Sequence, residues 1–96
     1  KVRQAETYGS IDGQGILCSV RRVDDDFVLL VVNETADGLG FSLEGLPAKL
    51  NGRTLFRLYS TEEHTVADRR LTDGIKPREV HVYATSRRFE DPLARN

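Results

Sequence analysis

Apolar residues are densest in one run, Phe27–Asn33, which reads FVLLVVN and directly follows three aspartates, Asp24–Asp26. Both alternating faces of this run are apolar, and it is rich in valine. Such a run is typical of a strand buried on both sides rather than of the half-wet strand of a small single sheet. It is too short to cross a bilayer as a helix. We therefore expect a two-layer β domain built around this strand.

Shorter apolar segments, separated by turn signals, make up the rest of the chain. Leu39–Leu46 alternates cleanly, as a strand with one dry face does, and no amphipathic helical stripe appears. Turn signals recur about every eight to twelve residues, a spacing typical of a sandwich or barrel. The sequence therefore predicts an all-β fold, an antiparallel β-sandwich of about six to eight short strands with Greek-key-like connections. The other expected strands are 16–23, 54–60 and 80–85, with edge strands at 64–67 and 70–72, and the expected turns include 24–26, 35–38, 51–52, 68–69 and 73–74.

The alternation within each strand predicts which side chains form the core. In the last strand, Val80, Val82 and Ala84 are expected to point inward, which places His81 on the outer face or at an interface with a neighbouring domain. The expected core comprises Ile16, Cys18, the residues 27–32, Phe41, Leu43, Phe56, Leu58, Val80 and Val82.

Length and composition fit one folded domain. The chain has 96 residues, of which 39% are hydrophobic and 30% charged, an ordinary balance for a globular domain. We divide it into a linker or lead-in strand at 1–15, the sandwich at 16–86 and a polar C-terminal tail at 87–96. The first residue is Lys1 rather than methionine, which favours a fragment or processed product of a longer protein.

Charge and cysteine content exclude several kinds of site. Fourteen basic residues balance fifteen acidic ones, for a net charge of −1, so no overall field favours nucleic acid or an anionic membrane. The single cysteine, Cys18, excludes an internal disulfide and a cysteine-based zinc site. It lies in the apolar stretch Ile16–Cys18, where a buried thiol acts as a small hydrophobic group.

No catalytic constellation emerges from the carboxylates and histidines. Asp24–Asp26 offers clustered oxygens of the kind that calcium prefers, but the three are consecutive, and a solvated hairpin turn fits them better. Glu62, Glu63 and Asp68 lack the sugar-shaped cleft that two glycosidase carboxyl groups require. His64 and His81 stand at no recognisable metal-ligand spacing. We therefore expect no catalytic, cofactor-binding or metal-binding residues, no cofactor and no enzymatic activity.

The aromatic residues provide the remaining candidates for contact with a ligand or partner. The chain has no tryptophan, and three of its aromatics are tyrosines, which tolerate a half-dry setting at an interface. Sugar-binding modules stack substrate rings on exposed aromatic side chains, so a carbohydrate-binding face is an alternative. The expected surface or interface contacts are Tyr8, Tyr59, His81 and Tyr83.

Several landmarks occur in a distinctive order. They are Asp26 followed by FVLLVVNET, then GFSLEGLPAKLNGRTLFRLYS, and then Leu71 followed by TDGIKPREVHVY. In this order they resemble the small C-terminal β-sandwich domain of (β/α)8-barrel glycoside hydrolases, over residues 16–84. The resemblance implies that the catalytic acids lie in a preceding barrel, so no catalytic residue is assigned to this chain.

The resemblance also implies a function. Such domains usually pack against the side of the barrel, so we expect a non-catalytic accessory domain of a carbohydrate-active enzyme that acts in domain packing and stability. The expected partner is a catalytic barrel of the same parent chain, with polysaccharide as a second one and with neither nucleic acid nor membrane. The alternatives are a carbohydrate-binding module and an unrelated protein–protein interaction domain. A parent that hydrolyses polysaccharide would be secreted or periplasmic.

Overall fold

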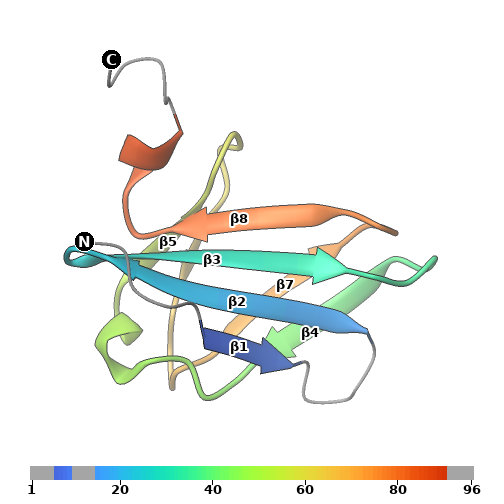
Figure 1. Ribbon diagram of the computed structural model, residues 1–96, viewed down its shortest axis with the longest axis horizontal. Coiled ribbons are helices and arrows are strands. Elements are labelled where there is room, and N and C mark those ends of the chain that lie inside the picture. The colour runs from blue at the N-terminus through green and yellow to red at the C-terminus, as the bar shows by residue number, and fades with distance from the viewer. Residues whose placement is uncertain (1–5, 10–14, 91–96) are drawn as a thin grey trace.

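In the computed structural model the chain folds into two antiparallel β-sheets (Figure 1), and the structure describes residues 6–9 and 15–90, with side chains from residue 15. Their strands are β1 (Glu6–Gly9), β2 (Ile16–Val23), β3 (Asp26–Asn33), β4 (Leu39–Leu43), β5 (Thr54–Arg57), β6 (Glu63–Thr65), β7 (Leu71–Ile75) and β8 (Val80–Ala84). Short 3-10 helices lie at Ala48–Leu50 and Arg87–Phe89. The predicted all-β, antiparallel fold is confirmed.

The two sheets differ in size. Over the described residues, the larger sheet has the order β1-β2-β3-β8-β5-β6, and the smaller one pairs β4 with β7. The last strand, β8, returns to lie between β3 and β5 (Figure 1), a long return of the Greek-key kind. The strand predicted from the FVLLVVN run is therefore central, with β2 on one side and β8 on the other.

The hairpin between β2 and β3 forms where the aspartates predicted it. Val23 pairs with Asp26, which leaves Asp24 and Asp25 as the two-residue turn. Asp24 adopts a left-handed φ of 56°, which aspartate tolerates better than most residues. Its carbonyl accepts a hydrogen bond of 2.9 Å from Arg22 Nε.

The core lies between the two sheets and contains most of the predicted residues. The confirmed ones, all less than 9% exposed, are Ile16, Cys18, Phe27, Leu29, Val31, Phe41, Leu43 and Leu58. Alternation alone did not indicate Leu46 and Leu50, which a connection and a 3-10 helix bring into the core at 0% exposure. Phe56 is only half-buried, with the Arg87 guanidinium 5.0 Å from its ring centre.

The prediction that β8 turns Val80 and Val82 inward is wrong, although Ala84, also expected inward, is 0% exposed. Val80 is 51% exposed and Val82 half-buried, whereas His81 and Tyr83 are 2% and 0% exposed. The cause is the pairing register, because β3 aligns its inward Leu29 and Val31 with Tyr83 and His81. A shift of one residue in such a register moves every side chain of a strand to the other face.

The expected turn at 73–74 is also wrong. Asp73 and Gly74 lie inside β7, where Gly74 pairs with Gly40 of β4. The chain instead reverses at Asp68–Arg69, which adopt left-handed φ values of 54° and 57° between the paired residues 67 and 70. The turn at 68–69 was predicted. After it, β7 continues as one strand through the position of the turn expected at 73–74.

Candidate functional site

One face of the larger sheet carries a continuous apolar surface on its outer side. The cross-strand pairs align Leu17, Val32 and Val80 in one row, and Leu30 and Val82 in the next. Val28 extends the surface toward the Asp24–Asp25 turn. We call these six side chains, Leu17, Val28, Leu30, Val32, Val80 and Val82, the outer apolar face.

The outer apolar face is open to solvent as far as the described residues show. Leu17 is 42% exposed, Leu30 41% and Val80 51%. Around Leu30 lies a shallow hollow of about 310 Å³, lined by Ser19, Arg21, Val28, Leu30 and Val82. The prediction that the central strand is buried on both sides therefore holds for the inner face only. Exposed apolar patches are candidate interaction surfaces.

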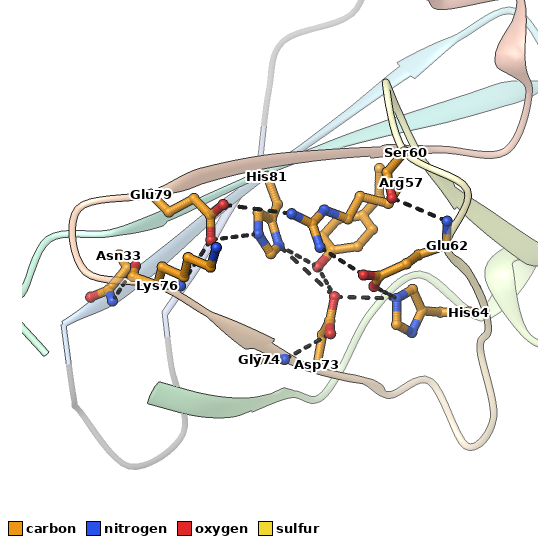
Figure 2. A network of polar contacts seen from close by, with 11 residues as sticks. Asn33, Arg57, Ser60, Glu62, His64, Asp73, Gly74, Lys76, Glu79 and His81 are labelled. Carbon is orange, nitrogen blue, oxygen red and sulfur yellow. Dashed lines mark hydrogen bonds and ion pairs between the residues drawn. The ribbon is translucent and has the colours of Figure 1, made fainter. Parts of the chain in front are cut away.

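A second feature is a polar network between the sheets, at the middle of β6 and the middle of β7 (Figure 2). The Tyr83 hydroxyl donates to Asp73 Oδ2 at 2.5 Å and contacts His81 Nδ1 at 2.9 Å. His64 Nε2 lies 3.2 Å from the same Asp73 oxygen. Because Tyr83 and His81 belong to β8 and Asp73 to β7, the network joins the larger sheet to the smaller one.

Burial governs the acid–base behaviour of Tyr83. Loss of solvation raises the pKa of its hydroxyl far above the ordinary value for tyrosine, and the hydrogen bond to the Asp73 carboxylate raises the pKa further. Both effects favour the neutral phenol, because a phenolate here would be unsolvated and would lie beside another negative charge.

We therefore expect stability to fall at alkaline pH. The pKa of Tyr83 is raised in the folded state, and unfolded tyrosine ionises at about pH 10. The buried neutral phenol therefore stabilises the fold fully below about pH 10, and this stabilisation is lost as the pH rises above that value. The measurement is urea unfolding between pH 8 and pH 11, comparing wild type with Tyr83→Phe. The variant should be less sensitive to pH over this range, and equal slopes would contradict the assignment.

Arg57 of β5 and Glu79, directly before β8, extend the network (Figure 2). The Arg57 guanidinium lies 3.2 Å from Glu62 Oε2 and 3.6 Å from Glu79 Oε2. Glu79 Oε1 accepts a 2.8 Å hydrogen bond from the Lys76 backbone N–H and lies 3.0 Å from His81 Nε2. The Lys76 bond above all, with His81 and Arg57, lowers the pKa of Glu79.

Asp26 is held by neighbours at the other end of β3. Its Oδ1 accepts a 2.7 Å hydrogen bond from Thr85 Oγ1, and its Oδ2 a 3.0 Å bond from Arg88 Nε. Arg53 lies 3.5 Å from Oδ1. The Thr85 bond, followed by Arg88 and Arg53, lowers the pKa of Asp26. These contacts tie the hairpin to the segment after β8 and occupy both carboxylate oxygens of Asp26, one of the three aspartates considered above for calcium.

Of the four expected contact residues, His81 and Tyr83 are brought together within the part of the chain whose side chains the structure describes. Tyr8 lies in β1, and its side chain is outside the described residues. Tyr59 is 72% exposed, with a left-handed φ of 63° and its backbone N–H bound to Glu90 Oε2 at 2.6 Å. His81 and Tyr83 adjoin each other but are buried, which corrects the expectation that His81 lies on the outer face. Sequence reasoning gave no signal for Asp73 as their partner, because it was placed in a turn.

Of the remaining candidate carboxylates, Glu63 and Asp68 line one open hollow of about 410 Å³, whereas Glu62 is not part of its lining. Glu62 is bound to Arg57 and lies 3.5 Å from His64 Nε2. Asp68 lies at the exposed turn before β7.

Among the described residues, no helix is long and apolar enough to cross a membrane.

Comparisons with known proteins identify the fold. No family model and no curated protein matches the chain. The structure of AmyP in complex with maltose matches it with a TM-score of 0.69 and 15% identity, and that of AmyP E221Q in complex with maltotriose with 0.67 and 16%. Each match covers 86% of this chain but only 16% of the AmyP chain. The chain thus shares its fold with a small part of a much longer protein.

Proposed function

We propose that this chain is a non-catalytic accessory β-sandwich of a glycoside hydrolase, and that the outer apolar face packs against the catalytic domain of the same polypeptide. The observation that carries the proposal is the face itself, because three large side chains on two adjacent rows are 41–51% exposed. An interface between domains of one chain buries about 600–1,500 Å². A domain packed on this face would bury the outer side of β3 as well, as the apolar residues on both faces of that strand predict.

Two further observations support this partner. The fold matches 16% of each AmyP chain, the share expected of one small domain in a larger enzyme. AmyP was crystallised with maltose and maltotriose, which agrees with the resemblance of the sequence to domains that accompany glycoside hydrolase barrels. Within the polar network Glu62 lies against Arg57 and Asp73 accepts a hydrogen bond from the Tyr83 hydroxyl, an arrangement that supports a structural rather than a hydrolytic function.

The test is hydroxyl-radical footprinting of the natural polypeptide that contains these residues. We expect Leu17, Leu30 and Val80 to react with hydroxyl radicals far less than their exposure in the isolated fold predicts, because the neighbouring domain covers them. Leu30→Asp should expose the face and lower the thermal midpoint of the whole protein, since a carboxylate would be buried at the interface. Thr72→Asp, an exposed position on β7, is the matched control. Full reactivity of the three residues in the natural polypeptide would refute the packing.

A carbohydrate-binding module is the second candidate, favoured by the 72% exposure of Tyr59. Electrophoresis of the same preparation through gels that contain amylose distinguishes domain packing from carbohydrate binding. If the chain acts only in domain packing, amylose should not slow the migration of either wild type or Tyr59→Ala. Retardation that is lost in Tyr59→Ala would favour the carbohydrate-binding function, because the variant removes the ring on which a sugar would stack.

A further inference from the structure

Three side chains of the polar network present one nitrogen and two oxygens to a common point. They are Glu62, before β6, His64 in β6 and Asp73 in β7, and their ligand atoms lie within 4.8 Å of one another. We propose that these residues form a binding site for a divalent transition metal ion, with zinc as the best match. The site is separate from the outer apolar face, because Tyr83 and His81 point to the opposite side of β8 from Val80 and Val82.

The distances between the ligand atoms fit a small tetrahedral ion. His64 Nε2 lies 3.2 Å from Asp73 Oδ2 and 3.5 Å from Glu62 Oε1. Zinc bonds of about 2.0–2.1 Å place any two tetrahedral ligands about 3.4 Å apart. An ion bound by His64 and either carboxylate therefore requires movements of only a few tenths of an ångström. The remaining edge is closed by Glu62, whose side chain is half exposed and whose other oxygen, Oε2, lies 3.2 Å from Arg57 Nη1.

The His64 nitrogen is the second observation that points to a ligand. Nε2 is buried and, like Nε2 of His81, makes no hydrogen bond of acceptable direction with any group among the described residues. Buried polar atoms almost always find such a partner, and each exception calls for an explanation. A metal ion supplies one, because an imidazole nitrogen binds it through the lone pair and the two carboxylates complete the set.

Neighbouring groups already orient the two carboxylates. Asp73 accepts hydrogen bonds on both oxygens, from the Tyr83 hydroxyl on Oδ2 and from the Gly74 backbone N–H at 2.7 Å on Oδ1. Arg57 binds Oε2 of Glu62 and leaves Oε1 facing His64. Such outer contacts fix the ligands of metal sites, and the second lone pair of each oxygen stays available for the ion.

The donor set selects the class of metal. Calcium and magnesium take oxygen ligands, so an imidazole in the set disfavours both. Imidazole with carboxylates suits zinc and its neighbours in the first transition row. Three protein ligands leave the fourth tetrahedral position for water. The competing interpretation is a set of ion pairs, in which a protonated His64 lies between Glu62 and Asp73 and binds no metal.

The test is isothermal titration of zinc chloride into the natural protein after treatment with EDTA, in a buffer that does not bind metal. We expect a single saturable site, weakened at least about tenfold in Glu62→Gln and abolished in His64→Gln. Glu63→Gln is the matched control, because it removes an adjacent exposed carboxylate that lies outside the set.

A second measurement covers the case in which a variant is unstable. Excess zinc should raise the thermal midpoint of wild type and of Glu63→Gln, because a ligand that binds only the folded state stabilises it. Glu62→Gln, a change at a half-exposed side chain, should show a smaller rise. An undetectable site in wild type, or equal binding by His64→Gln or Glu62→Gln, would overturn the proposal. These outcomes are independent of whether the outer apolar face packs against another domain.

Discussion

Replacing Leu29 by alanine is expected to destabilise the fold by about 2–5 kcal/mol, the usual cost of removing a buried leucine side chain. Leu29 is 0% exposed and belongs to the central core cluster. Few atoms can move to fill the space, because β3 is fixed by strands on both sides. The measurement is the urea midpoint of unfolding, with the slope against denaturant unchanged.

The next residue on the same strand provides the control. Leu30→Ala changes the same number of atoms at a position that is 41% exposed, so its cost should stay below about 1 kcal/mol. Leu29→Ala and Leu30→Ala therefore measure separately how much the inner and the outer face of β3 contribute to stability. Equal losses at both positions would contradict the assignment of Leu30 to an uncovered surface of the isolated fold.

Asp73→Ala is expected to cost about 1–3 kcal/mol, the penalty for a buried hydroxyl that loses its acceptor. Asp73 accepts the hydrogen bond of the fully buried Tyr83 and lies 3.2 Å from His64 Nε2. Its loss removes the contacts that join β7 to β8 and β6. Urea unfolding in the presence of EDTA measures this cost without any contribution from a bound ion.

Two variants separate this effect from a general loss of charge. Glu62→Ala removes another carboxylate of the network, but Glu62 is half exposed, so the expected cost is only about 0–1 kcal/mol. The double variant Tyr83→Phe/Asp73→Ala should cost less than the sum of its single changes, because neither group is then left without its partner. Strict additivity would mean that the hydrogen bond contributes nothing to stability.

Much of the fold could be predicted from local patterns. The aspartates gave the turn before β3, and the Asn51–Gly52 pair gave a turn in which Gly52 adopts a φ of 78°. The run of valine and leucine gave a central strand. These predictions succeeded because turn chemistry and β-branched side chains act over a few residues.

The candidate sites were less predictable, for a reason visible in β8. Val80, His81, Val82 and Tyr83 alternate between aliphatic and polar or aromatic residues, and the hydrophobic pattern favoured the valines as core. The structure buries the histidine and tyrosine instead, where the Tyr83 hydroxyl contacts His81 Nδ1 and donates a hydrogen bond to Asp73 of a distant strand. That partner was also hidden by the Asp-Gly pair, which indicates a turn but here continues a strand.

The sequence alone determined that this protein is an antiparallel β fold and that its central strand has two apolar sides. A period of two residues fixes which side chains share a face, but it does not say which face meets the second sheet. Only the tertiary structure decided that Leu29 and Val31 face the core while Leu30 stays uncovered. The same packing gathered Glu62, His64 and Asp73 from separate positions, because contacts between strands depend on register and layer order rather than on neighbouring residues.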